Sequence, residues 1–219
     1  MPIDDQRDER FQGSEISRAR REFNLIAPVY DMILGRSMTR LYRLAVDALL
    51  ETHPFSPMAA ALDVGTGTGL LAGVLAERGF EVTGIDVSEG MLRAARRRRG
   101  GLAAFRVAPA HSASAQPGAP YDLVCSAMLL HGFPRDYRQL VLKDMCRASR
   151  RLVMIVDYVP HRSPFTSVVE RLEGSHYPGF LREFADDLAA SFESMSVRPL
   201  SPTCGVYICD GTRNRQGGI

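Results

Sequence analysis

A glycine-rich stretch at residues 60–71, which reads AALDVGTGTGLL, constrains the fold of this chain more than any other feature. An apolar run precedes the glycines, threonines alternate with them, and apolar residues at helical spacing follow them. This order predicts a buried strand, a tight turn and the start of an amphipathic helix. Because glycine adopts positive φ and has no Cβ, a ligand can approach the backbone of such a turn, where the helix amides point outward. The stretch therefore predicts a ligand site.

Strands and helices alternate along the chain after this stretch. We expect strands at residues 60–64, 81–85, 103–107, 121–126 and 152–156, and helices at 69–78, 88–99 and 135–148. Between 111 and 120 we expect no regular element, because small residues and prolines dominate there. The strands read as nearly continuous apolar runs, which is typical of strands that are buried on both faces. The alternation predicts a doubly wound, mainly parallel α/β sheet of the Rossmann-like kind.

The last third of the chain predicts a different connection. A helix that begins after Pro178 carries a row of apolar side chains, namely Phe180, Leu181, Phe184, Leu188 and Phe192. Two strand-like runs follow at 193–198 and 205–209. The segment between them is too short for a crossover helix, so we expect an antiparallel hairpin at the sheet edge and seven strands in all.

The segment before the first strand predicts a helical cover for the sheet. We expect a disordered tail at 1–13 and helices within 14–52, the second of which begins at Ser37 as its cap. The apolar face of this second helix would consist of Leu41, Leu44, Ala45, Ala48 and Leu49. With an α/β core at 58–219, this organisation predicts a single domain at 14–219.

Composition argues against several classes of protein. A net charge of +2 gives no reason to expect a nucleic-acid partner. No apolar run reaches the roughly 18 residues of a membrane span, and the polar, acidic N-terminus does not resemble a signal peptide. The four cysteines form no recognisable framework, so we expect reduced core cysteines in a cytoplasmic protein. His, Asp and Glu show no metal-ligand spacing, and we expect no metal site.

Carboxylates lie at the ends of the first two predicted strands, where ligands bind in sheets of this kind. Asp86 follows Gly65 by 21 residues, the distance at which a carboxylate reaches the ribose hydroxyls of a nucleoside held over the glycine turn. The glycine spacing is G-x-G-x-G instead of G-x-G-x-x-G, and Asp63 places a negative charge close to where a pyrophosphate would lie. Both features favour a nucleoside with a cationic or amino-bearing end over a dinucleotide.

Three blocks, LDVGTGTG, VTGIDVS and YDLVCSAMLLH, resemble the signature blocks of class I S-adenosylmethionine-dependent methyltransferases. The resemblance implies that S-adenosylmethionine is the cofactor, with its methionine end at the glycine turn and its ribose at Asp86. The cofactor-binding candidates are Asp63, Gly65, Thr66, Gly67, Gly69, Asp86, Val87, Met91, Ser126 and Met128. The chain departs from the family after the third strand, where an acidic residue usually contacts adenine and Pro109 or Ala110 stands here.

The segment FNLIAPVYD, at residues 23–31, resembles the N-terminal segment of the methyltransferases of quinone biosynthesis and related small-molecule and lipid enzymes. By that resemblance Tyr30 would approach the methionine end of the cofactor. His131 follows the fourth strand, and its imidazole could act as a base near the acceptor. We take Tyr30 and His131 as catalytic candidates; a histidine that only caps or packs remains the alternative for His131.

These observations predict methyl transfer from S-adenosylmethionine to a small-molecule or lipid-like acceptor, without a nucleic-acid partner or a transmembrane segment. We also consider that the protein forms a homodimer. Two other readings stay open. One is a nicotinamide (NAD)-dependent oxidoreductase; the other is a non-catalytic binding module with the methyltransferase fold, which the residues at 109–110 support best.

Overall fold

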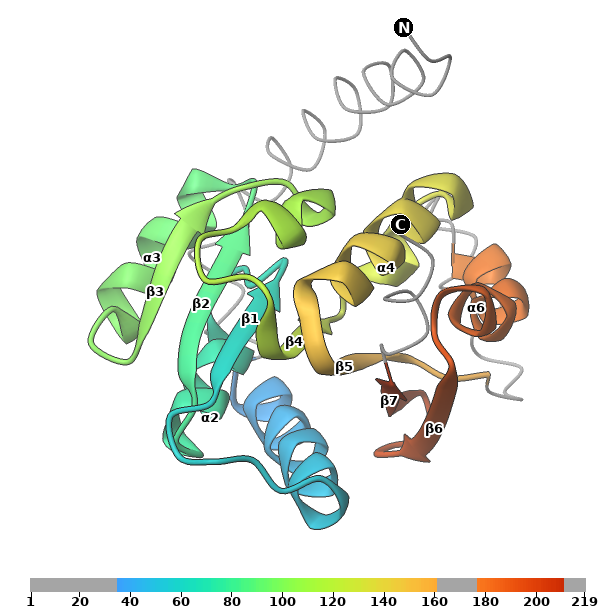
Figure 1. Cartoon of the computed structure of the whole chain (residues 1–219), viewed down its shortest axis with the longest axis horizontal. Helices are drawn as coiled ribbons and strands as arrows, with labels where there is room; N and C mark the ends of the chain where they lie inside the picture. The colour runs from blue at the N-terminus through green and yellow to red at the C-terminus, as the bar shows by residue number, and fades with distance from the viewer. Residues whose placement is uncertain (1–34, 161–176, 211–219) are drawn as a thin grey trace, which may run out of the picture.

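The computed structural model describes residues 35–160 and 177–210. Its centre is one mixed sheet of seven strands (Figure 1). The strands lie in the order β3-β2-β1-β4-β5-β7-β6. Their bounds are β1 (Ala60–Val64), β2 (Glu81–Asp86), β3 (Ala103–Val107), β4 (Tyr121–Ala127), β5 (Ser149–Tyr158), β6 (Ser194–Pro199) and β7 (Cys204–Asp210). The first five strands are parallel, and β7 runs antiparallel to both of its neighbours, β5 and β6. The carboxyl ends of β1 to β5 therefore meet at one edge.

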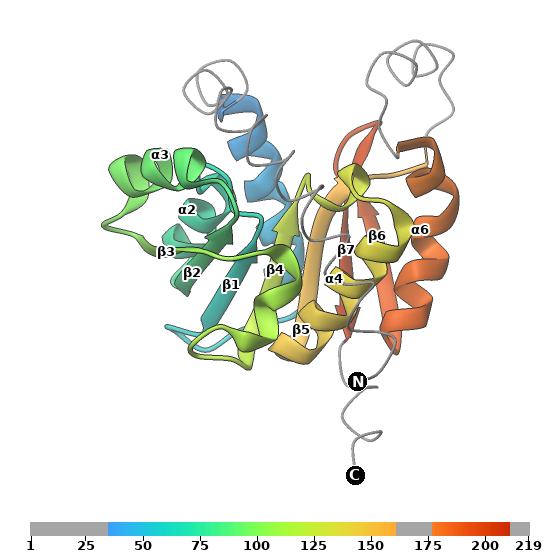
Figure 2. The ribbon, with the colours of Figure 1, turned by 90° about the horizontal axis from the view of Figure 1, so that it is seen from above.

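Helices cover both faces of the sheet. They are a helix at residues 35–52, α2 (Leu70–Glu77), α3 (Glu89–Arg99), the 3₁₀ turns η1 (Ala110–Ala115) and η2 (Leu130–Gly132), α4 (Arg135–Ala148) and α6 (Tyr177–Ser191). The helix at 35–52 packs with α2 and α3 on one face, and α4 packs with η1 and α6 on the other. Figures 1 and 2 show α4 and the helix at 35–52 on opposite sides of the strands.

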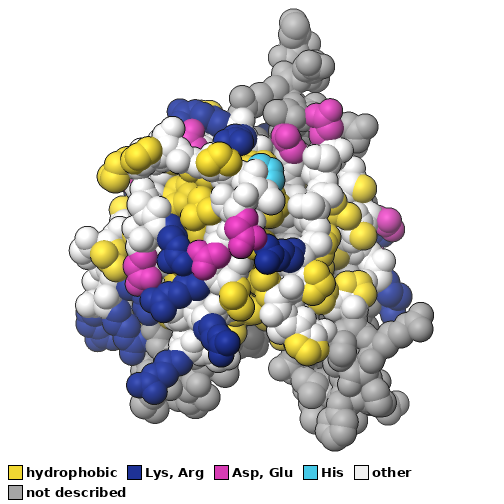
Figure 3. Space-filling model, turned by 90° about the horizontal axis from the view of Figure 1, so that it is seen from below, with side chains coloured by type: hydrophobic (Ala, Val, Ile, Leu, Met, Phe, Trp, Pro, Cys, Tyr) yellow, Lys and Arg dark blue, Asp and Glu magenta, His cyan; other side chains and the backbone are white. Residues whose placement is uncertain are grey.

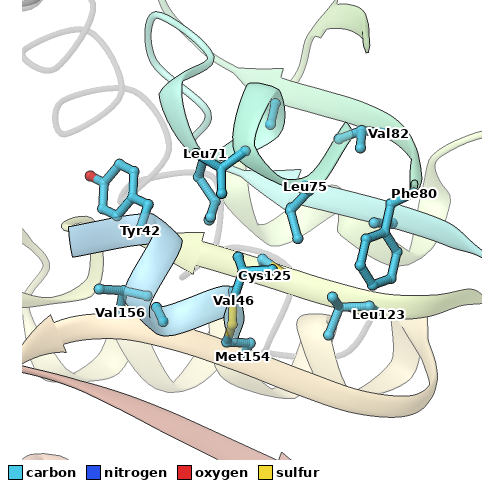
Figure 4. Packing of buried hydrophobic residues seen from close by; sticks show 14 of the residues in the cluster. Tyr42, Val46, Leu71, Leu75, Phe80, Val82, Leu123, Cys125, Met154 and Val156 are labelled. Atoms are coloured by element: carbon cyan, nitrogen blue, oxygen red, sulfur yellow. The ribbon is translucent and has the colours of Figure 1, made fainter. Parts of the chain in front are cut away.

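The helix at 35–52 is held to the sheet by apolar packing (Figure 4). Val46 extends from it toward Cys125 and Met154 of the central strands, Tyr42 lies on the side of Leu71 of α2, and all five side chains are buried. Burying one large apolar side chain contributes about 1.5–3 kcal/mol to folding. This packing fixes the position of a helix that precedes the first strand.

A buried ion pair holds α6 against α4. Arg138 and Asp187 are 1% and 0% exposed, and the Nε atom of Arg138 donates a hydrogen bond of 2.8 Å to the Asp187 carboxylate. Arg135 and Gln139 donate to the same carboxylate. Burial opposes ionisation of Asp187, but these hydrogen bonds outweigh it and lower the pKa of the carboxyl group. The network places α6 beside η2, the turn that carries His131.

The predicted fold class is confirmed. The bounds of β1, β3 and α4 are those expected from the sequence, and the two last strands form the expected antiparallel hairpin, with β6 at the edge of the sheet. Buried strands with turn signals on both sides leave few other arrangements, which explains the agreement.

Four expectations about local structure were wrong in whole or in part. The segment expected to be irregular contains η1, because Asp144 of the distant α4 accepts hydrogen bonds from the amide and the hydroxyl of Ser114. The backbone is already helical at residue 35, so Ser37 does not begin the helix. Ala45, Ala48 and Leu49 of the face expected for this helix are buried and Leu41 packs against the core, but Leu44 is 46% exposed, and Tyr42, which was not expected on this face, is buried. In addition, β5 begins at Ser149, three residues before its apolar run.

Some expectations concern residues outside the described ranges. The tail at 1–13, the helix expected after it and Tyr30 all lie there, so the predicted domain boundaries remain a prediction. In the two described ranges, no helix combines the length and apolar character that a bilayer crossing requires. All four cysteines are buried, and none of them forms a disulfide.

Candidate functional site

The turn between β1 and α2 leaves open space beside one of its three glycines. Gly65, Gly67 and Gly69 have φ of +70°, +53° and +81°. A Cβ on Gly65 would lie 2.6 Å from Leu129 Cδ2, and one on Gly69 would lie 2.9 Å from the ring of Phe105, so packing requires glycine at both positions. At Gly67 no atom of the described residues lies within 4 Å of a Cβ position. A ligand can therefore reach the backbone at Gly67.

Asp86, at the end of β2, is fixed against this turn. Its Oδ2 accepts a hydrogen bond of 2.9 Å from the Gly67 amide, and its Oδ1 accepts one of 2.8 Å from the Ser88 amide. Burial raises the pKa of Asp86, and these backbone hydrogen bonds partly offset the effect. A carboxylate has about four lone-pair positions, so two amide partners leave capacity for the hydroxyl groups of a ligand.

Asp63 is a buried carboxyl group below the same turn. It is 1% exposed, and its Oδ2 accepts a hydrogen bond of 2.6 Å from Thr66 Oγ1. Burial raises its pKa from 3.8 to about 7, although the hydrogen bonds from Thr66 and Ala72 oppose the shift and the charge of Asp86 adds to it. Because the folded pKa is raised, the ionised group destabilises the fold, and this penalty grows as the pH rises from 3.8 to about 7. A cation bound nearby would offset it.

The remaining cofactor candidates of the first two strands shape the turn. Thr66 is buried and is held by Asp63 and by the hydrogen bond from its amide to the Ile85 carbonyl. Val87 is partly exposed next to Asp86. Met91 is buried in the first turn of α3, where its amide donates to the Oγ of the capping residue Ser88.

The candidates at the end of β4 show two unusual features. Ser126 is fully buried, and its hydroxyl is the one side-chain polar atom in the described residues that is buried without a hydrogen-bond partner. Met128 has a φ of +51°, which a residue other than glycine rarely adopts. Its amide donates a hydrogen bond of 2.8 Å to the Val156 carbonyl, which holds the strained turn in place. Strain of this kind is concentrated at functional sites.

His131 and Asp157 form a hydrogen-bonded pair at the ends of β4 and β5. His131 Nδ1 lies 2.7 Å from Asp157 Oδ1, and the carboxylate, which is fully buried, also accepts hydrogen bonds from the Leu130 and Tyr158 amides. Since backbone donors already occupy both oxygens, the imidazole donates from Nδ1. Nε2 then carries the free lone pair. The His131 side chain is 22% exposed, so this nitrogen belongs to a partly open site.

Asp157 is the residue that sequence reasoning left without a role. Asp157 directly follows the apolar run of the fifth strand, and this position at a strand end was the sequence signal for a site residue. Its pairing with His131, however, depends on the register of β4 and β5. The chain connects this pair to the glycine turn through Leu129, which packs against Gly65. Pro109 directly precedes η1, and Tyr30 lies outside the described residues.

The residues present fit an adenosyl amino acid. A ligand can approach the backbone closely at Gly67, and Asp86 offers hydrogen-bond acceptors for ribose hydroxyls. The buried charge of Asp63 favours an ammonium group and disfavours a pyrophosphate. In the described part of the chain, no three His, Cys, Asp or Glu side chains lie together in a way that could hold a metal ion.

The comparisons with known proteins agree with this geometry. A family model described as a methyltransferase domain matches residues 61–151. The demethylmenaquinone methyltransferase of Beutenbergia cavernae is 31% identical over 218 residues, which cover 90% of this chain and 85% of that protein. Three other curated methyltransferases match only locally, and this chain spans 31%, 32% and 26% of their lengths.

Solved structures share the fold at low identity. The DhpI–SAH complex has a TM-score of 0.68 at 21% identity, with 89% of this chain and 95% of that chain covered. Magnesium protoporphyrin IX methyltransferase from Synechocystis PCC 6803 with bound SAH has a TM-score of 0.59 at 17% identity, with 79% and 83% covered. With the long match to the Beutenbergia enzyme, these findings show that the chain belongs to the class I S-adenosylmethionine-dependent methyltransferases.

Proposed function

We propose that this protein transfers a methyl group from S-adenosylmethionine to the oxygen of a small-molecule or lipid-like acceptor. The observation that carries the proposal is the hydrogen bond between the Gly67 amide and Asp86, beside the open space at Gly67. It places a carboxylate and bare backbone together at the edge of the sheet. The buried charge of Asp63 lies below the same turn.

In this proposal the cofactor supplies an electrophilic methyl group on a sulfonium. Gly67 admits its methionine end, Asp63 stabilises the ammonium group through its charge, and Asp86 accepts hydrogen bonds from the ribose. Gly65 and Gly69 keep the turn compact, and Val87, Met91, Ser126 and Met128 line the surroundings. Tyr30 is retained as a proposed contact at the methionine end.

On the acceptor side, His131 is the proposed base and Asp157 its positioning residue. Nε2 takes the proton of an acceptor hydroxyl, and the Asp157 carboxylate stabilises the imidazolium that results. A hydroxyl loses this proton when its oxygen is methylated, so a fixed base next to the cofactor site favours an oxygen acceptor. Orientation and exclusion of water supply most of the remaining rate enhancement.

The relatives suggest the kind of acceptor. The Beutenbergia relative is a demethylmenaquinone methyltransferase, and a locally similar protein of Bordetella avium is a ubiquinone biosynthesis O-methyltransferase. We therefore propose a hydroxylated aromatic or quinol-like acceptor. We also propose a cytoplasmic location, since none of the four cysteines forms a disulfide. We propose no nucleic-acid partner, and a homodimer as the assembly to be measured by light scattering.

Calorimetric titration with S-adenosylhomocysteine (SAH) tests the cofactor assignment. We expect the wild-type protein to bind SAH and the Asp86→Asn variant to bind it about tenfold or more weakly, because hydrogen bonds to a charged group contribute about 1.5–3 kcal/mol. NADH is titrated in parallel. Binding of NADH without binding of SAH would support the oxidoreductase reading instead, and failure of both ligands would support a non-catalytic module.

A pair of glycine variants separates loss of the ligand site from loss of stability. Gly67 and Gly79 both have positive φ, +53° and +87°, and in the described part of the chain no atom lies within 4 Å of either Cβ position. Alanine at either position should destabilise the fold by about 1–2 kcal/mol. Only Gly67→Ala should also weaken SAH binding, because Gly79 lies in the loop between α2 and β2. Equal SAH affinity of the two variants would contradict a ligand at Gly67.

Rates of methyl transfer to catechol or quinol acceptors test the proposed base. His131→Gln and Asp157→Asn should each lower kcat on the order of 10²–10⁴-fold, with SAH affinity retained. His111→Gln is the matched control, since His111 lies on η1 and pairs with the Tyr137 hydroxyl of α4, not with Asp157. Full activity of the His131 variant would exclude this base.

A further inference from the structure

A pocket lined by four arginines lies outside the site described above. Arg36, Arg40 and Arg43 come from the helix at 35–52, and Arg99 comes from the end of α3. Leu70, the first residue of α2, also lines the pocket, which is open to the surface and has a volume of about 340 Å³. Figure 3 looks onto the face that carries the helix at 35–52, and dark-blue basic side chains gather on its left half.

The three arginines of the helix share one face. They are spaced by four and three residues, so their side chains are neighbours on the helix surface. Like charges at this spacing destabilise a helix unless an anion lies between them. Arg43 has such a partner, because its Nη2 lies 3.0 Å from Glu77 Oε2. For Arg36 and Arg40, no ion pair with a carboxylate is present among the residues that the structure describes.

Arg99 is held in place from the opposite side. Its Nη1 donates a hydrogen bond of 2.8 Å to the Thr68 carbonyl, in the glycine turn. Its side chain lies over α2 where Gly73 leaves room, since a Cβ there would lie 3.1 Å from Arg99 Cδ. A guanidinium fixed in this way loses less conformational entropy when it binds an anion.

The charges of the pocket define the ligand that it would accept. Four guanidinium groups line the pocket; one of them pairs with Glu77, and Arg36 and Arg40 have no carboxylate partner among the described residues. A phosphate monoester carries about −1.5 to −2 at neutral pH and matches the fork of arginine donors. The volume is at the lower end of the roughly 300–1,000 Å³ of small-molecule sites. It has room for a phosphoryl group and part of the molecule that carries it.

We propose that this pocket is a second ligand site, which binds a phosphoryl group through Arg36, Arg40, Arg43 and Arg99. Two sources share this chemistry: a free phosphorylated small molecule and the headgroup of an anionic phospholipid. The pocket adjoins the glycine turn through Leu70 and Arg99. A ligand bound there would lie next to the cofactor site without occupying it.

The test uses a double variant with a charge-matched control. Arg36→Gln/Arg40→Gln removes two charges from the pocket at exposed helical positions, and Arg93→Gln/Arg97→Gln removes two exposed charges from α3 outside it. The probes are inorganic phosphate and glycerol 3-phosphate, titrated calorimetrically at constant ionic strength. Phosphatidylcholine vesicles with and without phosphatidylglycerol are tested by sedimentation. SAH affinity is measured for each protein.

We expect saturable binding of phosphate probes, of phosphatidylglycerol vesicles or of both, about tenfold weaker in the pocket variant and little changed in the control. The probe that binds identifies the source, and SAH affinity should be retained. Equal losses in the two variants would show diffuse attraction to a basic surface and overturn the proposal. So would the absence of binding to every phosphate probe, or a parallel loss of SAH affinity.

Discussion

The hydrogen bond from the Gly67 amide to Asp86 is the contact on which the site depends. It joins the turn after β1 to the end of β2, two segments that are neighbours only because their strands pair in parallel. The turn can then keep a positive φ at Gly67 with open space beside it. The parallel pairing of β1 and β2 thus brings the backbone of Gly67 and the carboxylate of Asp86, a hydrogen-bond acceptor, together at one edge of the sheet.

Sequence reasoning predicted the sheet well because each buried strand carried its own signal. The strand at 60–64 and the helix at 135–148 were predicted with the bounds that are observed. Errors arose where the signal was not local. The helix at 35–52 buries Tyr42 and leaves Leu44 exposed, because docking on the sheet decides its face. Similarly, η1 depends on Asp144, which is 30 residues away from Ser114.

The same division applies to the site. The glycines, Asp63 and Asp86 lie within one motif and could be proposed from spacing alone. Pairing of His131 with Asp157 spans 26 residues and requires two adjacent strand ends. The arginines of the pocket come from two helices, and no periodicity in the sequence predicts that these helices lie next to each other. Contacts of this kind depend on tertiary structure, so the sequence could offer the residue types but not their partners.

The central claim is that the turn and its two carboxylates receive the amino-acid end and the ribose of an adenosyl cofactor. Burial raises the pKa of Asp63 to about 7, so the group is partly protonated at neutral pH without ligand. An ammonium group bound nearby favours the ionised form of Asp63, so the carboxyl group releases its proton when the cofactor binds. Calorimetry of SAH binding at pH 7, in buffers of different ionisation enthalpy, measures this release directly. The account predicts proton release that disappears in Asp63→Asn; heats that do not depend on the buffer in the wild-type protein would contradict it.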